Sequence, residues 1–258
     1  MENESTTQVS PVDALVLAGG DGRGLDPEMP AKGLFRLAGK PMVQWVLEAL
    51  RAASTVREIV VVLPPGYDSS EWEHLCDHIA RSDGSFADNI AAGLEHLRKD
   101  ISVVGVTSDI PTLTPDSIDD LVTQTRELGA DVSYPLIREE VVLAQFPAAE
   151  RTFVKLKGGR VTGGNAMVFD PTHFTRLRDF TQGMFDARKN PLKMARLVGP
   201  KFAIKLSAGQ LEPVDVEKRL TKLLGLKGVA VYSPYACIGA DVDKPADVAP
   251  IEAVLKGH

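Results

Sequence analysis

Apolar runs of strand length recur through the first half of the chain. Ala14–Ala18, Ile59–Leu63 and Ile101–Val106 are short, largely apolar runs that end in polar or glycine-rich turns. Such runs are typical of buried parallel strands, which are covered on both faces. A fourth strand is expected at Ala130–Tyr134. The pattern therefore predicts a sheet whose strands are separated by longer connections.

The connections between these runs carry the spacing of amphipathic helices. One helix is expected to open at Pro41, a second to place Phe86, Ile90 and Leu94 on one face, and a third to begin at Thr114, which is followed by proline. Threonine is a favoured N-cap, and proline is tolerated in the first turn. Alternation of strand and helix favours right-handed βαβ units. We therefore predict an α/β fold of Rossmann-like type with a mostly parallel central sheet.

The pattern changes after about Leu136. Residues 152–156 and 161–169 are expected to form strands joined by a turn, and residues 171–225 to be mainly helical. A strand at 228–232 and a short helix after Pro245 follow, with Pro250 expected to kink that helix or delay its start. We expect a flexible lead at residues 1–10 and a single domain at 11–258, with a smaller inserted lobe at about 137–227.

Composition and charge narrow the classes of protein. The 258 residues are 44% hydrophobic and 25% charged, a globular balance, and the formal net charge is -6. Nucleic-acid binding draws its affinity from phosphate neutralisation, so no nucleic-acid partner is expected. No apolar run reaches the length of a membrane span, and the polar start lacks a signal-peptide core. We expect a cytoplasmic protein without membrane association.

The cysteines and histidines do not form a recognisable metal or disulfide pattern. Cys76 and Cys237 are too far apart in the sequence to indicate a disulfide framework or a cysteine-based zinc site. His74, Cys76 and His78 are expected to lie on one helix, where the two histidines share a face. A third ligand is missing, so zinc binding there is not favoured.

The segment from Leu15 to Met42 carries the strongest chemical signal. A predicted strand leads into a loop that contains several glycines and is followed by Arg23 and Lys32. Glycines let backbone amides approach a phosphate closely, and the carboxyl edge of a parallel sheet is where α/β folds bind ligands. The loop lacks the G-K-[ST] ending of a P-loop, and no helix follows it directly. A plain surface turn remains the alternative for the glycines alone.

The whole segment resembles the nucleotidyltransferases that activate sugar phosphates, alditol phosphates and molybdopterin, of the MobA-like NTP transferase type. The residues that carry the resemblance are Leu17, Ala18, Gly19, Gly20, Asp21 and Gly22, then Lys32, then Gly39, Lys40, Pro41 and Met42. The resemblance implies that the backbone from Leu17 to Gly20 contacts the base and ribose. It also implies that Gly22 and Arg23 border the triphosphate and that Lys32 neutralises the phosphates.

One position departs from the family pattern. Many members have an arginine two places after the third glycine, and Gly24 stands there in this chain. Arg23, one residue earlier, is the candidate to replace it, with a different geometry.

Two aspartates are candidate magnesium ligands. Asp109 directly follows the third predicted strand, and residues 109–115 resemble the family's D-[MI]-P-x-L-[TS]-P metal motif. Residues 241–248 resemble its second metal element, in which Asp243 occupies the ligand position. Because Asp241 and Asp243 alternate along an expected extended segment, only one of them should reach the metal. Mg²⁺ takes oxygen ligands, usually one or two carboxylates with phosphate oxygens. A turn or cap role is the alternative for Asp109.

Two asparagines complete the candidate site. Asn89 stands where related enzymes place a serine near the nucleotide, and it is equally a polar residue of a helix N-terminus. Asn165 opens the strand that runs beside the acceptor in relatives, so acceptor binding is expected there, or a bulge without ligand contact.

The resemblance implies a function. We expect a Mg²⁺-dependent nucleotidyltransferase, of EC 2.7.7 type, that joins an NMP from an NTP to a phosphorylated small molecule and releases pyrophosphate; GTP or CTP is favoured, but the sequence leaves the base open. The inserted lobe should select the acceptor, whose identity the sequence leaves open, as it does the oligomeric state. A catalytically silent, nucleotide-binding regulatory protein of the same fold is the alternative. The basic stretch 186–205 is expected to be a solvated helix face; otherwise it would gather an anionic acceptor, the favoured functional alternative, or an acidic surface such as a membrane face.

Overall fold

The structure is a computed structural model. It describes residues 10–29, 31–147, 151–187, 190, 193, 196–197 and 199–257, and the statements below concern these residues. Within this part of the chain, none of the helices combines the length and the apolar character that crossing a membrane requires.

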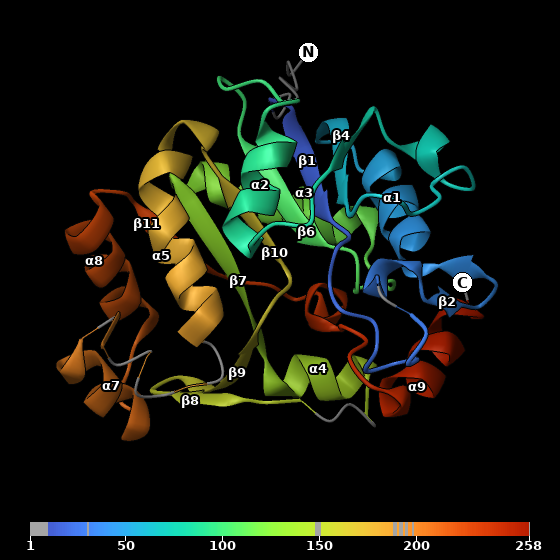
Figure 1. Ribbon diagram of the computed structural model, residues 1–258. Coiled ribbons are helices and arrows are strands. Elements are labelled where there is room, and N and C mark those ends of the chain that lie inside the picture. The colour runs from blue at the N-terminus through green and yellow to red at the C-terminus, as the bar shows by residue number, and fades with distance from the viewer. Residues whose placement is uncertain are drawn as a thin grey trace, which may run out of the picture.

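A large mixed sheet forms the centre of the molecule (Figure 1). Its strands run in the order β5-β4-β1-β6-β10-β7-β9-β8, and β11 pairs with β7. The first four are mutually parallel, as is the β11–β7 pair, whereas β8, β9 and β10 pair antiparallel with their neighbours. The strands are β1 (Val12–Leu17), β4 (Val56–Leu63), β5 (His78–Arg81), β6 (Val103–Thr107), β7 (Val132–Arg138), β8 (Val154–Leu156), β9 (Gly159–Gly163), β10 (Ala166–Phe169) and β11 (Gly228–Tyr232).

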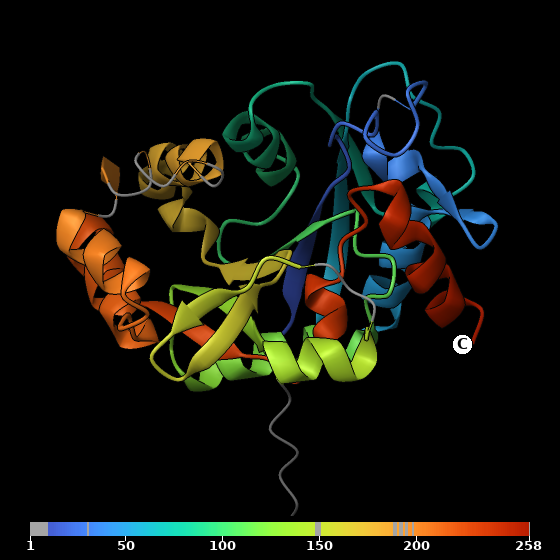
Figure 2. The same cartoon turned by 90° about the horizontal axis from the view of Figure 1, so that it is seen from below.

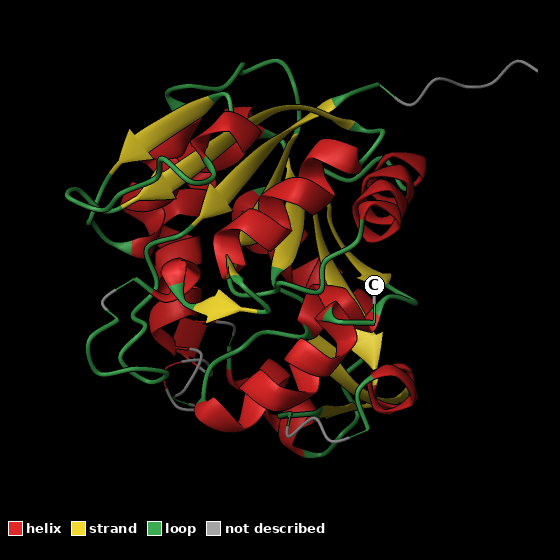
Figure 3. Ribbon diagram, turned by 90° about the vertical axis from the view of Figure 1, so that its right-hand side faces the viewer, coloured by secondary structure: helices red, strands yellow, loops and turns green. Residues whose placement is uncertain are grey.

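Helices cover both faces of this sheet (Figure 3). Helices α1 (Met42–Ala52) and α3 (Pro115–Glu127) pack on one face, and α2 (Phe86–Leu94) and α5 (Phe174–Ala187) pack on the other. The two-residue period of a strand explains the division, because Val16 of β1 faces the first pair of helices and Leu15 faces α2. The Rossmann-like α/β fold predicted from the alternation of elements is therefore confirmed.

The remaining elements surround the carboxyl edge of the parallel strands and the far end of the sheet. A small separate sheet, β2–β3, follows the glycine loop, and α9 packs beside it. Helix α8 packs against β11. These elements are β2 (Arg36–Leu37), β3 (Lys40–Pro41), α4 (Glu139–Gln145), α7 (Pro200–Ser207), α8 (Pro213–Leu224), α9 (Pro245–Leu255) and the 3-10 turns η1 (Lys32–Leu34), η2 (Glu73–Leu75), η3 (Pro171–His173) and η4 (Ala236–Gly239).

Local signals located several elements correctly. Thr114 is the N-cap of α3: its side chain accepts from the backbone N–H of Ser117, whose hydroxyl completes a capping box. The predicted turn between residues 156 and 161 joins β8 and β9 as a hairpin. Helix α9 begins at Pro245 and contains Pro250, so the delayed start, one of the two effects expected of Pro250, does not occur.

The predicted helix carrying His74, Cys76 and His78 is wrong. Residues 73–75 form a single 3-10 turn, and His78 begins β5, where its ring stacks on that of His96 at 5.5 Å. The apolar spacing there belongs to an edge strand, so the two histidines do not share a helix face.

The single strand predicted for residues 161–169 is divided by a bulge. Ser133 pairs with Val168 and Leu136 pairs with Gly163, so three steps along β7 oppose five steps along its partner. The extra residues fall at Gly164 and Asn165. Gly164 has no room for a side chain, because a Cβ there would lie 2.6 Å from Ile238. The bulge redirects the chain beside the end of β6.

Candidate active site

The glycine loop and the first metal motif leave the sheet side by side. Leu17 ends β1 and pairs with Thr107 at the end of β6, and the N–H of Ser108 donates to the Leu17 carbonyl at 3.1 Å. Because neighbouring parallel strands end at one edge, the residues that follow each of them meet there. Figure 2 looks onto this edge, where the blue glycine-loop segment lies beside the red C-terminal segment.

Glycines hold the Lys32 turn against the end of β6. The N–H of Lys32 donates to the Gly20 carbonyl at 2.6 Å. A Cβ at Gly33 would lie 2.4 Å from the Ser108 hydroxyl oxygen, and a Cβ at Gly22 would lie 2.5 Å from the Met29 carbonyl oxygen. Residues with side chains at 22 or 33 would therefore move the lysine away from the strand edge.

Lys32 joins the two carboxylates that resemble the family's metal ligands. Its ammonium group donates to Asp109 at 2.6 Å and also to Asp243. The lysine is buried, and burial alone would lower its pKa, but the two carboxylates outweigh burial and raise that pKa above its usual range. Burial likewise opposes the charge of Asp243, yet its bond from Lys32 holds the pKa of that carboxyl below its usual range. The Thr107 hydroxyl donates to the other oxygen of Asp109.

Asp241 corrects the expectation that only one aspartate of its pair faces this site. Carboxylate oxygens of Asp109, Asp241 and Asp243 lie within 4.8 Å of one another. The segment is not a regular strand: the N–H of Val242 donates to the Asp109 carbonyl at 2.9 Å, and Ala240 has φ -96° and ψ 62°. Side chains therefore do not alternate, and both aspartates approach Asp109.

Arg151 is the partner of Asp241. Both terminal nitrogens of its guanidinium donate to one Asp241 carboxylate oxygen. Burial raises the pKa of Asp241 to about 6, with the charge of Arg151 opposing that rise and the nearby Asp109 and Asp243 adding to it. Sequence reasoning did not identify Arg151, because an isolated arginine between two predicted elements carries no pattern.

The three carboxylates suit a hard divalent cation. Mg²⁺ is bound through carboxylate and phosphate oxygens, and all the donor atoms of this cluster are carboxylate oxygens. Asp109 and Asp241 are partly buried and Asp243 is exposed, so the cluster opens to the solvent side from which a phosphate would come. The residues present therefore fit Mg²⁺.

Arg23 stands apart from this cluster. Its guanidinium forms two hydrogen bonds with Asp21, at 2.9 and 2.8 Å, and its side chain is 70% exposed. The side-chain bond to Arg23 lowers the pKa of Asp21 to about 2. Position 24, where the family pattern described above has an arginine in many members, lies against the C-terminal segment: a Cβ at Gly24 would lie 3.2 Å from the Asp243 carbonyl oxygen. A side chain at 24 would press on this segment.

Asn89 lies beside the start of the glycine loop. Its carbonyl oxygen accepts from the Ser82 hydroxyl at 2.7 Å, and its amide nitrogen lies 3.9 Å from the Cβ position of Gly19. Pro64 contacts the same position at 3.4 Å. The amide N–H₂ therefore faces the backbone that the resemblance assigns to the nucleotide.

Asn165 lies at the same edge of the sheet through the β9–β10 bulge. Its carbonyl accepts from the N–H of Thr107 at 3.1 Å, and its N–H donates to the Ile238 carbonyl at 2.8 Å. The structure thus joins the start of β10 to the strand that precedes Asp109. Acceptor binding by Asn165 stays a prediction, as does the division of the chain into a domain and an inserted lobe.

The basic stretch is only partly described. Arg188 and Lys189 lie outside the described residues, whereas Lys193, Arg196 and Lys201 are exposed. Lys205 pairs with Asp215 of α8 at 2.8 Å. Lys205 therefore serves the local helix packing.

Comparison with known proteins identifies the family. A family profile described as MobA-like NTP transferase domain matches residues 14–200. A hypothetical transferase from Thermus thermophilus has 32% identity and a TM-score of 0.82, over 93% of this chain and 100% of that one. The 2-C-methyl-D-erythritol 4-phosphate cytidylyltransferase of Bifidobacterium longum is 33% identical over 126 residues, 46% of this chain and 41% of the relative.

A longer alignment covers nearly the whole chain. The bifunctional protein GlmU of Parvibaculum lavamentivorans is 26% identical over 262 residues, 94% of this chain and 52% of the relative. The chain thus spans about half or less of the length of these curated relatives. The profile covers most of the chain, including the glycine loop, Lys32 and Asp109, and on this basis the chain belongs to the MobA-like NTP transferase domain family.

Proposed function

We propose that the protein transfers a nucleotidyl group from an NTP to a phosphorylated small molecule and releases pyrophosphate. The observation that carries the proposal is the meeting of Lys32, Asp109 and Asp243 at the end of the glycine loop. A cation and a group of carboxylates at one sheet edge can bind phosphates directly and through a divalent cation. A module that only bound nucleotide would not need this arrangement.

The proposed chemistry is an in-line displacement at the α-phosphorus. An oxygen of the acceptor phosphate forms the new bond, and the bond from the α-phosphorus to the bridging oxygen of pyrophosphate breaks. The attacking oxygen is already ionised, so no general base is required. The protein contributes position and charge. Lys32 would leave the carboxylates for the triphosphate, and the amides of Gly19, Gly20 and Gly22 would border the nucleotide.

Mg²⁺ fits the carboxylate group and is part of the proposal. Asp109 and Asp243 would hold it, and Asp241 is close enough to take part. When bound, the ion neutralises charge on the phosphates of the NTP.

CTP is the first donor to test, with GTP as the second. The cytidylyltransferase of Bifidobacterium longum supports CTP, since its similarity to this chain is 33% over 126 residues. Asn89 is proposed to contact the base or ribose through its amide N–H₂, and Asn165 to contact the acceptor.

A second candidate function rests on Arg23 and Gly24. Arg23 pairs with Asp21 in the solvent, and no arginine stands at position 24. A catalytically silent protein that binds an NTP for regulation would tolerate that loss.

Two measurements separate these functions. The first is a thermal-shift screen of the four NTPs, with and without Mg²⁺. One NTP should raise the melting temperature of the protein more than the other three do, because ligand binding stabilises the folded state. Pyrophosphate release with sugar phosphates, alditol phosphates and molybdopterin should then identify an acceptor. Nucleotide binding without release for any acceptor would favour the regulatory protein. No shift with any NTP would contradict both functions.

A further inference from the structure

The Arg151–Asp241 pair joins the inserted segment to the carboxylate cluster. Arg151 lies between α4 and β8, whereas Asp241 lies 90 positions later, between η4 and α9. The two side chains are only 16% and 19% exposed. A guanidinium held this way is directed into the site rather than into solvent, although the described residues 151–153 belong to no helix or strand.

The two cations of the cluster divide the carboxylates between them. Lys32, from the glycine loop, bonds Asp109 and Asp243, and Arg151 bonds Asp241. The first cation belongs to the part of the chain proposed to bind the NTP. The second belongs to the part expected to select the acceptor. In a displacement between two phosphates, each phosphate needs a cation, and the chain supplies one from each part.

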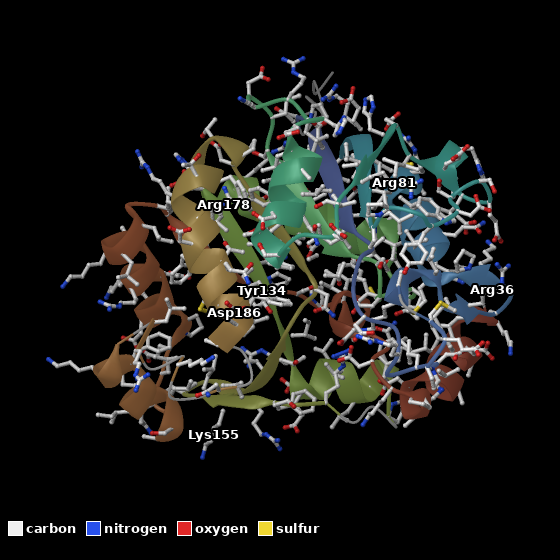
Figure 4. All side chains as sticks on the ribbon, in the orientation of Figure 1. Arg36, Arg81, Tyr134, Lys155, Arg178 and Asp186 are labelled. Atoms are coloured by element: carbon white, nitrogen blue, oxygen red, sulfur yellow. The ribbon has the colours of Figure 1, made fainter. Side chains whose placement is uncertain are left out.

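Two uncharged polar residues lie on this side of the site: Tyr134 is near enough for the charge of Asp241 to act on its phenol, and Asn165 bonds the backbone at the end of β6. The Tyr134 hydroxyl lies over Gly163, where a Cβ would be 2.1 Å from its oxygen. A tyrosine phenol is protonated at neutral pH, so the Tyr134 hydroxyl is able to donate a hydrogen bond. The side chain of Tyr134 is 46% exposed, and Figure 4 labels it near the middle of the view. Asn165 lies in the bulge that follows Gly163.

We propose that Arg151 binds the phosphate of the acceptor, and that Asp241 holds the guanidinium in position until that phosphate replaces its carboxylate. The inference rests on the proposed nucleotidyl transfer and names the acceptor residue for it. Guanidinium binds phosphate and carboxylate in the same forked geometry, and a phosphate dianion carries the greater charge. The acceptor in this proposal is a phosphate monoester, and the Tyr134 hydroxyl beside Gly163 offers a hydrogen-bonding partner that suits the hydroxyl groups of sugar or alditol phosphates.

A purely structural ion pair makes the opposite prediction for one variant. If Asp241 competes with the acceptor phosphate for Arg151, then Asp241→Asn should free the guanidinium and strengthen phosphate binding. If the pair only fastens the C-terminal segment, the same change should leave phosphate binding unchanged or weaken it. Asp241→Asn therefore separates the two accounts.

The test uses inorganic phosphate as the probe and a filled nucleotide site. The protein is first saturated with Mg²⁺ and the non-reactive α,β-methylene analogue of whichever NTP gives the largest thermal shift. Phosphate is then titrated, and its dissociation constant is obtained from the rise in melting temperature and from calorimetry. Arg151→Gln should weaken phosphate binding about ten-fold or more, and Asp241→Asn should strengthen it about ten-fold, a factor that corresponds to about 1.4 kcal/mol.

The matched control is Arg160→Gln. Arg160, on β9, pairs with Glu139 at 2.9 Å, but its side chain is 55% exposed. Its loss should not change phosphate binding. Arg151→Gln leaves Asp241 without its cation, so the double variant Arg151→Gln/Asp241→Asn restores neutrality; it should fold and still fail to bind phosphate.

The possible outcomes distinguish this inference from the proposed function. Absence of any Mg²⁺–nucleotide binding contradicts the proposed function itself. If nucleotide binding is normal, three results would contradict only the role of Arg151. The unmodified protein could fail to bind phosphate, or Arg151→Gln or the double variant could bind phosphate as well as the unmodified protein does. The third result is that Asp241→Asn does not strengthen phosphate binding.

Discussion

The ammonium group of Lys32 lies 2.6 Å from a carboxylate oxygen of Asp109, although the two residues are 77 positions apart. The glycine loop after β1 brings the lysine to the sheet edge, and β6 brings the aspartate. Their contact joins the two motifs that resemble the family's phosphate and metal elements. The predicted effects of replacing Lys32 or Asp109 follow from this contact.

Replacing Lys32 should weaken transfer without removing it. In Lys32→Ala, kcat/KM for the NTP should fall ten-fold or more, about 1.4 kcal/mol of transition-state stabilisation per factor of ten, because a cation no longer faces the phosphates. Steady-state pyrophosphate release measures this. Lys40→Ala is the control, since Lys40 follows the same loop but pairs with Glu48 at 2.7 Å. An unchanged kcat/KM in Lys32→Ala would remove the lysine from the site.

Replacing Asp109 should abolish turnover and leave the fold intact. The carboxylate lies beyond the last residue of β6, so Asp109→Ala removes a candidate Mg²⁺ ligand without opening the core. Pyrophosphate release, circular dichroism and melting temperature test both parts. Asp116→Ala, at an exposed position in the first turn of α3, should be active. Full activity of Asp109→Ala would exclude a metal role.

Adding one methyl group at Gly33 should disturb the position of Lys32, because Gly33 packs against Ser108 at the end of β6. A Cβ there would lie 2.4 Å from the Ser108 hydroxyl oxygen and 3.0 Å from the Ser108 Cβ, so turning the hydroxyl aside still leaves a tight contact, and we expect Gly33→Ala to shift the Lys32 turn away from β6. We expect a loss of activity comparable to that of Lys32→Ala. In the β8–β9 turn, Gly158 has no atom within 4 Å of its Cβ position, which makes Gly158→Ala the matched control. Equal activity of the two variants would show that the turn can relax.

Asn89 should act on the nucleotide through the N–H₂ end of its amide. Ser82 donates to the other end at 2.7 Å, which orients the amide toward Gly19. Asn89→Asp replaces the donor by a carboxylate, so the dissociation constant of the preferred NTP should rise several-fold. Isothermal titration with Mg²⁺–NTP measures it. Gln124→Glu, which changes an amide on α3 that bonds Asp120, should leave it unaltered. Unaltered NTP binding in Asn89→Asp would make Asn89 a helix residue only.

Asp119 should make stability depend on pH in the acidic range. Its carboxylate accepts four hydrogen bonds from the backbone and hydroxyls of Ser54 and Thr55. Burial alone would raise its pKa, but the bonds, led by that from the Thr55 hydroxyl, hold the pKa below its usual range. A lowered folded-state pKa stabilises the fold above the unfolded pKa of about 3.9, and this stabilisation is lost as pH falls through the folded value.

The variant Asp119→Asn should change how the free energy of unfolding depends on pH. At neutral pH, Asp119→Asn should lower the free energy of unfolding by about 1.5–3 kcal/mol, the range for hydrogen bonds to charged groups. The difference from the unmodified protein should shrink below about pH 4. Denaturant unfolding at several pH values measures it. The neighbouring Asp120→Asn loses one bond from Gln124 and should show a smaller effect. A difference that grows toward acid pH would contradict the assignment.

Local chemistry made much of the fold predictable. The apolar run at 59–63 became the core of β4, and Thr114 with Pro115 began α3 where expected. Such signals act within a few residues, so they survive whatever tertiary surroundings follow. The false helix at His74 had only weak spacing, and pairing of Val60 with His78 at the sheet edge decided that segment instead.

Local sequence signals predicted only part of the candidate site. Lys32 and Asp109 follow a glycine loop and a buried strand, and parallel topology brings such ends together. The orientation of Asp241 depended on a backbone bond between Val242 and Asp109, which no local pattern encodes.

The sequence by itself determined the α/β architecture and the place of the glycine loop at the carboxyl edge of the sheet, and it indicated Asp109 and Asp243 as candidate metal ligands. Periodicity, caps and ordered motifs are local properties of the chain, so they can be recognised before folding. Only the tertiary structure decided that Asp241 joins Asp109 and Asp243 and that Arg151 pairs with it across 90 positions. The physical reason is that such contacts depend on how the bulge at Gly164 and the turn at Ala240 direct segments far apart in sequence into one place.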